Sequence, residues 1–171
     1  NANDGFCSNV DSIVISMRSL PVVVMEDSVV VCNGAFLTVE PISDGIIEWQ
    51  PAQGIVDHVT PIQTLSVSTD QVLYLSATNS WGCTRNDSIQ LHVVFPPSFS
   101  VSAASISSCA PLDVFESIDS CDMSDASFRW IIPGYDTLFG NIMNTTVRRS
   151  GVFDLVVEAY SIDGCMSDTV L

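Results

Sequence analysis

The sequence predicts an all-β protein built from tandem antiparallel β-sandwiches, and three observations support this. A Gly-Cys turn, or a close variant, precedes Asp-Ser or Asp-Thr and an apolar alternation at three places, around Cys7, Cys83 and Cys165. Short alternating runs separated by turn residues recur along the chain, and no helical periodicity is present. The cysteine spacings of 76 (83 − 7) and 82 (165 − 83) in a chain of 171 residues fit two small repeated domains.

Residues 21–96 form the first expected domain. Asn33-Gly34 and Asp44-Gly45 are tight-turn signals, and Pro51 ends a strand because it has no N–H for the ladder. The apolar runs predict about seven short strands, which is typical of a sandwich. Strands are expected over residues 22–25, 29–32, 35–39, 46–50, 64–68, 72–79 and 88–94.

Residues 97–171 form the second expected domain and repeat the plan. Residues 117–126 are polar and acidic, so we expect them to be an exposed loop. Residues 1–20 are expected to be the closing strand of a preceding repeat, over residues 12–17, followed by a linker. The first residues resemble a turn and the last lie within a strand pattern, so we expect a piece of a longer chain. Strands of the second domain are expected over residues 99–102, 112–115, 128–132, 145–149 and 152–160.

The charge of the chain limits its partners. The formal net charge is −15, with 20 acidic residues against five arginines and no lysine. Nucleic acid and anionic lipid are therefore poor partners, because few cations are present to replace their counterions. Six cysteines in a strand-rich acidic chain indicate an oxidising compartment. No run approaches the ~18 apolar residues that a membrane span requires.

The cysteines occupy matching positions in the two domains. Cys32 and Cys83 lie near the ends of the first domain, and Cys109 and Cys165 near the ends of the second. We therefore predict the disulfides Cys32–Cys83 and Cys109–Cys165, each closing a loop of roughly 50 residues. Cys7 is expected to pair with a cysteine upstream of residue 1. Cys121 is the odd one, either free or paired across a domain boundary or with another chain.

The three tryptophans fall into two classes. Trp49 and Trp130 each lie in an apolar strand between the two cysteines of their domain, which predicts a core tryptophan packed on an inter-sheet disulfide. Trp81 lies beside Gly82 at a turn and is a candidate surface contact for a partner.

Residues for catalysis or metal binding are weakly represented. Neither histidine accompanies a nucleophile motif, no Cys-x-x-Cys pair suggests zinc, and the carboxylates are scattered, so we predict no enzymatic activity. Asp119, Asp122 and Asp125 cluster in one expected loop and are the one candidate for a calcium site. Their spacing of three departs from the alternate-residue pattern of a calcium loop, which favours a solvated loop.

Two stretches resemble a known family. Trp49-Gln50-Pro51-Ala52-Gln53-Gly54-Ile55, followed by Tyr74 and by Asn79-Ser80-Trp81-Gly82-Cys83, resembles the Ig-like and PKD-like repeats of giant Bacteroidetes cell-surface proteins. Cys109-Ala110-Pro111, Phe128-Arg129-Trp130 and Gly151 to Cys165 are similar to the PKD-like variant. This resemblance implies type IX secretion and a relation to the SprB-like adhesin filaments of gliding bacteria.

The resemblance also gives a meaning to a recurring Asp-Ser/Thr-apolar pattern. From the residues alone, the pattern is a turn-to-strand entry in which Asp closes a local turn. The resemblance implies an O-glycosylation signal, which makes the protein an expected glycoprotein. The five candidate acceptors are Ser12, Ser28, Ser88, Thr137 and Thr169.

The sequence as a whole predicts a structural stalk segment of a large secreted adhesin, serving surface adhesion and gliding motility. The expected location is the cell surface, with outer-membrane attachment through other parts of the chain. Expected partners are neighbouring repeats, and surface polysaccharide or substratum. The alternative is a carbohydrate-binding or spacer module of a secreted polysaccharide-degrading enzyme.

Overall fold

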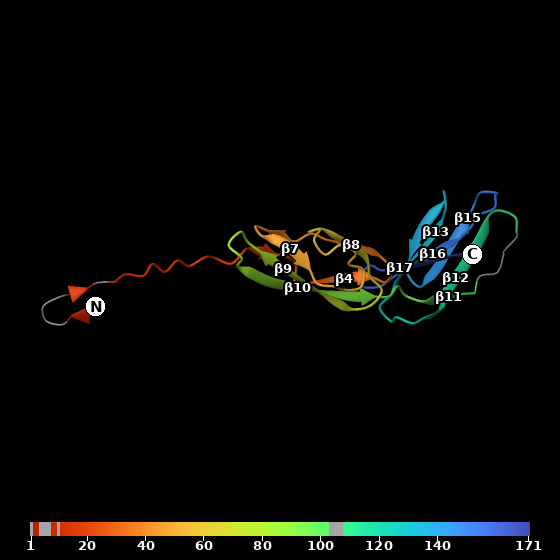
Figure 1. The fold of residues 1–171 in the computed structure, drawn as a ribbon. Helices are drawn as coiled ribbons and strands as arrows, with labels where there is room; N and C mark the ends of the chain where they lie inside the picture. Colours follow the sequence, from red (N-terminus) through yellow and green to blue (C-terminus); the bar gives the residue numbers. More distant parts are fainter. Residues whose placement is uncertain (1, 4–7, 10, 103–107) are drawn as a thin grey trace.

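The computed structural model describes residues 2–3, 8–9, 11–102 and 108–171, and every regular element in them is a β-strand. Two sandwiches lie end to end (Figure 1). An extended segment over residues 11–20 leads into the first sandwich from the small hairpin of β1 (Ala2–Asn3) and β2 (Ser8–Asn9).

The first sandwich is formed by one larger sheet and two short strand pairs. The larger sheet has the order β4-β10-β9-β7, in which β4 runs parallel to β10 and the other pairs are antiparallel. Its strands are β4 (Ser28–Cys32), β7 (Ile46–Trp49), β9 (Gln71–Thr78) and β10 (Thr84–Val94). The facing pairs are β3 (Val23–Val24) with β6 (Ile42–Ser43), and β5 (Phe36–Val39) with β8 (Gln63–Ser66).

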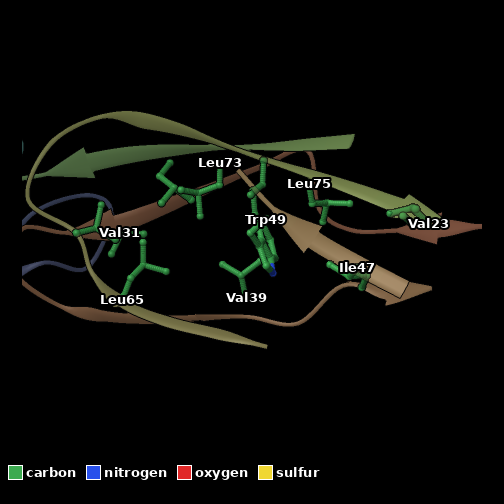
Figure 2. Packing of buried hydrophobic residues seen from close by; sticks show 12 residues of the cluster. Val23, Val31, Val39, Ile47, Trp49, Leu65, Leu73 and Leu75 are labelled. Atoms are coloured by element: carbon green, nitrogen blue, oxygen red, sulfur yellow. The ribbon is translucent and has the colours of Figure 1, made fainter. Parts of the chain in front are cut away.

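The core of the first sandwich follows from the period-two pattern of its strands. Alternate side chains of β9 turn inward, so Leu73 and Leu75 are fully buried (Figure 2). Trp49 lies opposite Leu75 in the ladder and is 2% exposed. Each such side chain contributes about 2–3 kcal/mol by leaving water.

The second sandwich has its own core, around Trp130 and Met143. One sheet has the order β11-β12-β15, and the other has the order β14-β13-β16-β17. The first sheet contains β11 (Phe99–Val101), β12 (Leu112–Cys121) and β15 (Ile142–Val147). The second contains β13 (Ser127–Ile132), β14 (Asp136–Phe139), β16 (Val156–Tyr160) and β17 (Met166–Val170).

The strand order identifies the fold. In each sandwich the tryptophan strand lies beside the penultimate strand, which lies beside the last, as strands C, F and G do in immunoglobulin domains. The opposite sheet pairs an early strand with the strand that precedes F, as β5 does with β8 and β12 with β15, and this corresponds to the partner sheet of that fold. The prediction of an all-β, Ig-like architecture is therefore confirmed.

Two local predictions are wrong. Residues 12–17 form no strand and are exposed, because within the described chain no strand lies alongside to pair with them. Residues 117–121 are not a loop but the second half of β12, where they pair with β11 and β15. Ladder pairing with β11 outweighed the polar composition of this half of the strand.

Candidate functional site at the junction of the two sandwiches

The disulfide of this structure joins the two sandwiches. Cys32, the last residue of β4, is bonded to Cys165 in the turn between β16 and β17. Their Cα atoms are 5.5 Å apart, although 133 residues separate them in sequence. Cys165 is 1% exposed, so the bond is enclosed at the junction.

This pairing corrects the predicted bridge Cys32–Cys83. In the register of the first sheet, Cys32 lies beside Val94, whereas Cys83 precedes Thr84 at the other end of β10. About ten residues of strand, roughly 33 Å, separate the two ends, while a disulfide needs Cα atoms about 4.4–6.8 Å apart. Cys83 is a free cysteine in the structure.

The predicted bridge Cys109–Cys165 is wrong for the same reason. Cys109 precedes β12, whose far end at Cys121 pairs with Phe99 near the junction. The strand is roughly 30 Å long, which places Cys109 at the distal end of the second sandwich. Cys109 is exposed and free, and Cys121 is partly buried and free. Cys7 itself lies outside the described residues, and its pairing with a cysteine upstream of residue 1 stays a prediction.

Polar contacts reinforce the junction around the linker of residues 95–98. Pro97 is fully buried, and its carbonyl oxygen accepts a hydrogen bond from the Ser167 hydroxyl. The Ser98 N–H donates to the Asp122 carboxylate at 2.8 Å, and the Asp122 N–H donates to the Ser98 carbonyl at 3.0 Å. The linker is therefore held by the residue that follows β12 and by β17, in addition to the disulfide.

This role of Asp122 bears on the calcium candidate. Asp119, Asp122 and Asp125 are all exposed, and Asp122 is engaged by the backbone of Ser98. Within the described part of the chain, no group of three or more His, Cys, Asp or Glu side chains is placed to hold a metal. The structure does not bring the three aspartates together as a site.

The core tryptophans are placed as predicted, but without a disulfide beside them. Trp130 is 1% exposed, and its indole N–H donates to the Gly140 carbonyl at 2.7 Å. The Trp49 indole N–H donates to the Pro61 carbonyl at 3.1 Å. The neighbouring strand presents Leu75 to Trp49 and Val157 to Trp130, so apolar side chains take the place of the expected bridge.

Trp81 lies in the turn between β9 and β10 and is 59% exposed. The Arg18 guanidinium lies 5.1 Å from the centre of its ring, within the range of a cation–π contact. Asn79 organises the turn, because its side-chain carbonyl accepts the N–H groups of Trp81 and Cys83 at 3.1 and 3.0 Å. A role of Trp81 as a partner contact stays a prediction.

A cluster of Arg129, Glu158 and Tyr160 was not found from the sequence. Arg129 and Glu158 are cross-strand neighbours that form an ion pair, and Arg129 also donates to the Tyr160 hydroxyl at 2.8 Å. The hydrogen bond that this hydroxyl donates to Glu158, with a smaller effect of burial, raises the pKa of Tyr160. The cluster ties β13 to β16. The signal that could have revealed it is the pair of opposite charges, Arg129 in one apolar strand and Glu158 in another, because such charges pair across neighbouring strands.

The candidate glycosylation residues differ in accessibility. Ser12, Ser28 and Thr137 are exposed, whereas Ser88 and Thr169 are partly buried within strands. In three of the motifs the aspartate carboxylate accepts the N–H of the next residue, at 2.8–2.9 Å. This contact agrees with the local structural role of the aspartate, and glycosylation stays a prediction.

Comparisons with known proteins add the following findings. No family model matches the chain, and no curated protein matches it. Among solved structures, the chain is similar to the Sidekick-1 immunoglobulin domains 1–5, with 16% identity, a TM-score of 0.42, and coverage of 88% of this chain and 38% of that one. It thus spans well under half of the Sidekick-1 chain.

Two further similarities are of the same kind. An E-to-A variant of titin domains I67–I69 gives 14% identity and a TM-score of 0.42, with coverage of 88% of this chain and 63% of that one. The DIP-gamma IG1+IG2 structure gives 12% identity and a TM-score of 0.36, with coverage of 89% and 95%. The described residues also contain no helix long and apolar enough to cross a membrane.

Proposed function

We propose that this chain is a load-bearing stalk segment of a large secreted cell-surface adhesin, in which it serves surface adhesion and gliding motility. The observation that carries the proposal is the disulfide Cys32–Cys165, which joins successive sandwiches instead of closing one of them. The family resemblance in the sequence supports a surface location, with anchoring through other parts of the chain. Surface polysaccharide or substratum is the proposed external partner of the whole adhesin, which would bind it at a distal tip and not through this stalk segment.

The disulfide determines which part of the chain carries tension. Force applied at the two ends enters before Cys32, crosses the sulfur–sulfur bond and leaves after Cys165. Residues 33–164 lie inside the closed loop and are not extended by that force. Most of both hydrophobic cores lies inside this loop and is thereby protected from stretching, whereas the core residues Val23 and Val31 precede Cys32 and lie in the part that carries the force.

The linker supports the same role. Pro97 is fully buried, and the contacts of Ser98 and Ser167 fix the chain where one sandwich meets the next. Proline fixes one backbone dihedral angle and so reduces the freedom of the hinge. The net charge of −15 makes adjacent stalks repel one another and limits lateral association.

Single-molecule stretching between handles at the two ends of the chain tests the proposal. In the oxidised chain, residues 33–164 should add no length when the sandwiches unfold. After reduction, the total increase in chain length when both sandwiches unfold should be larger by about 480 Å. The reason is that the loop of 133 residues can then extend by ~3.6 Å per residue. Cys109→Ala is the matched control and should behave like the unaltered oxidised chain.

Two results would count against the stalk function. An increase in chain length on unfolding that is the same before and after reduction would show that the disulfide does not carry the load. Specific binding of the isolated chain on an array of polysaccharides would instead indicate a carbohydrate-binding module.

A further inference from the structure

We propose that Cys83 and Cys109 are inter-unit bridging cysteines. Each forms, with an adjoining sandwich of the same kind, the bond that Cys165 and Cys32 form with one another in this structure. The chain thus contains one complete junction and one half of a junction at each end. This inference rests on structural equivalence within the chain and is independent of the proposed load-bearing role.

Cys83 and Cys165 occupy the same position in equivalent turns. The N–H of Gly82 donates to the Asn79 carbonyl at 3.0 Å, and that of Gly164 donates to the Ser161 carbonyl at 3.0 Å. Both glycines have positive φ, 79° and 82°, which this turn requires just before the cysteine. The cysteine N–H is bound by the Asn79 side chain in one turn and by the Ser161 hydroxyl in the other, at 3.0 and 3.1 Å.

The linkers that these turns contact are also equivalent. Pro21 and Pro97 are both fully buried, and the N–H of the residue after each donates to a carboxylate, Asp44 at 2.7 Å and Asp122 at 2.8 Å. The turn of Cys83 binds the linker through Asn79, which donates to the Ser19 carbonyl at 2.9 Å. The first sandwich therefore has at its N-terminal end a cysteine turn and a linker anchor equivalent to those of the second sandwich at the junction.

Cys109 matches Cys32 in the same way. Cys32 lies four residues before β5, whose first residue, Phe36, pairs with Ser66 of β8. Cys109 lies three residues before β12, whose first residue, Leu112, pairs with Val147 of β15. Both cysteines thus lie at the C-terminal end of their sandwich, where the next unit attaches. Exposure of Cys109 leaves its thiol accessible to such a unit.

Bond formation needs an oxidant, for which a small disulfide such as oxidised glutathione is sufficient. The Cys83 thiolate attacks one glutathione sulfur and expels a glutathione thiolate. The thiolate of Cys109 in the adjoining unit then attacks the Cys83 sulfur of the mixed disulfide and expels the second. Two protein thiols become one disulfide, and the two protons and two electrons leave on two molecules of reduced glutathione.

A tandem protein that contains two copies of the chain tests this inference. Asp168-Thr169-Val170-Leu171 parallels Asp11-Ser12-Ile13-Val14, so residue 171 of the first copy is joined directly to Ile15 of the second to keep the repeat in phase. Cys7 is replaced by serine. After equilibration in a glutathione redox buffer, free thiols are alkylated and tryptic peptides are identified without reduction.

We expect a bridge from Cys109 of the first copy to Cys83 of the second, in addition to Cys32–Cys165 in each copy. Cys109→Ser in the first copy should abolish the added bridge and leave Cys83 of the second copy open to alkylation. The same substitution in the second copy is the matched control and should change nothing at the new junction. The inference is overturned if both thiols remain fully alkylated while Cys32–Cys165 is formed, or if Cys109 pairs with Cys121.

Discussion

Removing the inter-sandwich disulfide should destabilise both sandwiches together. The bond closes a loop of 133 residues, and the loss of chain entropy in the unfolded state for such a loop is worth about 5 kcal/mol. Cys32→Ala deletes the bond and introduces no polar group, and little packing is lost because Cys32 is only partly buried. The fully buried Cys165 is a poorer place for the substitution.

Equilibrium unfolding in guanidinium chloride measures this difference. With a combined slope of about 5 kcal/mol per molar denaturant for the two sandwiches, the midpoint should fall by roughly 1 M. Unaltered protein in reducing buffer should show the same fall. Cys109→Ala is the control. The unfolding midpoint of this variant should equal that of the unaltered protein, because Cys109 is exposed and unbonded.

The reasoning is refuted if Cys32→Ala and Cys109→Ala unfold at the same midpoint. It is also refuted if reduction leaves the unaltered protein unchanged, since the loop would then contribute nothing to stability.

Three further predictions concern single side chains. Trp130→Ala should lower the free energy of unfolding, measured by thermal unfolding, by about 3–5 kcal/mol. Trp81→Ala, at an exposed position, should change the same free energy by less than about 0.5 kcal/mol. Asn79→Ala removes the bond to Ser19, so trypsin should cut faster after Arg18, as a digestion time course would show. Hydrogen bonds from Thr60 and Val59 lower the pKa of Asp57 below its ordinary value of 3.8. This carboxylate therefore stabilises the loop above that value and ceases to do so as the pH falls through the lowered pKa, a dependence that NMR titration should detect and that Asp57→Asn should remove.

The sequence was a good guide to the cores. The position of a large aromatic side chain within an apolar strand, β7 for Trp49 and β13 for Trp130, was sufficient to predict that both are buried. Burial of this kind depends on the local period of the strand and on the preference of tryptophan for the interior, and both can be read without knowing the topology.

The cysteine pairing could not be read in this way. Matching offsets showed correctly that the cysteines are equivalent, but not at which end of a sandwich each one lies. That depends on β4 running parallel to β10, which puts Cys32 beside Val94 and away from Cys83. A disulfide between two domains cannot be predicted when each domain is assumed to be closed by a disulfide of its own.

The polar segment over residues 117–121 was difficult for a related reason. Its composition is that of a loop, yet it continues β12, with Ser117 paired to β15 and residues 118–121 paired to β11. Backbone hydrogen bonds do not depend on side-chain polarity, so a long strand can continue through such residues when its neighbours are long enough.

A tryptic peptide map of the oxidised protein tests the central claim most directly, because the few arginines place the relevant cysteines on separate peptides. Residues 19–85 carry Cys32 and Cys83, residues 86–129 carry Cys109 and Cys121, and residues 150–171 carry Cys165. An inter-sandwich bond predicts that peptides 19–85 and 150–171 elute as one disulfide-linked species, which reduction separates into the two peptides. Linkage of 150–171 to 86–129, with 19–85 closed on itself, would contradict the account.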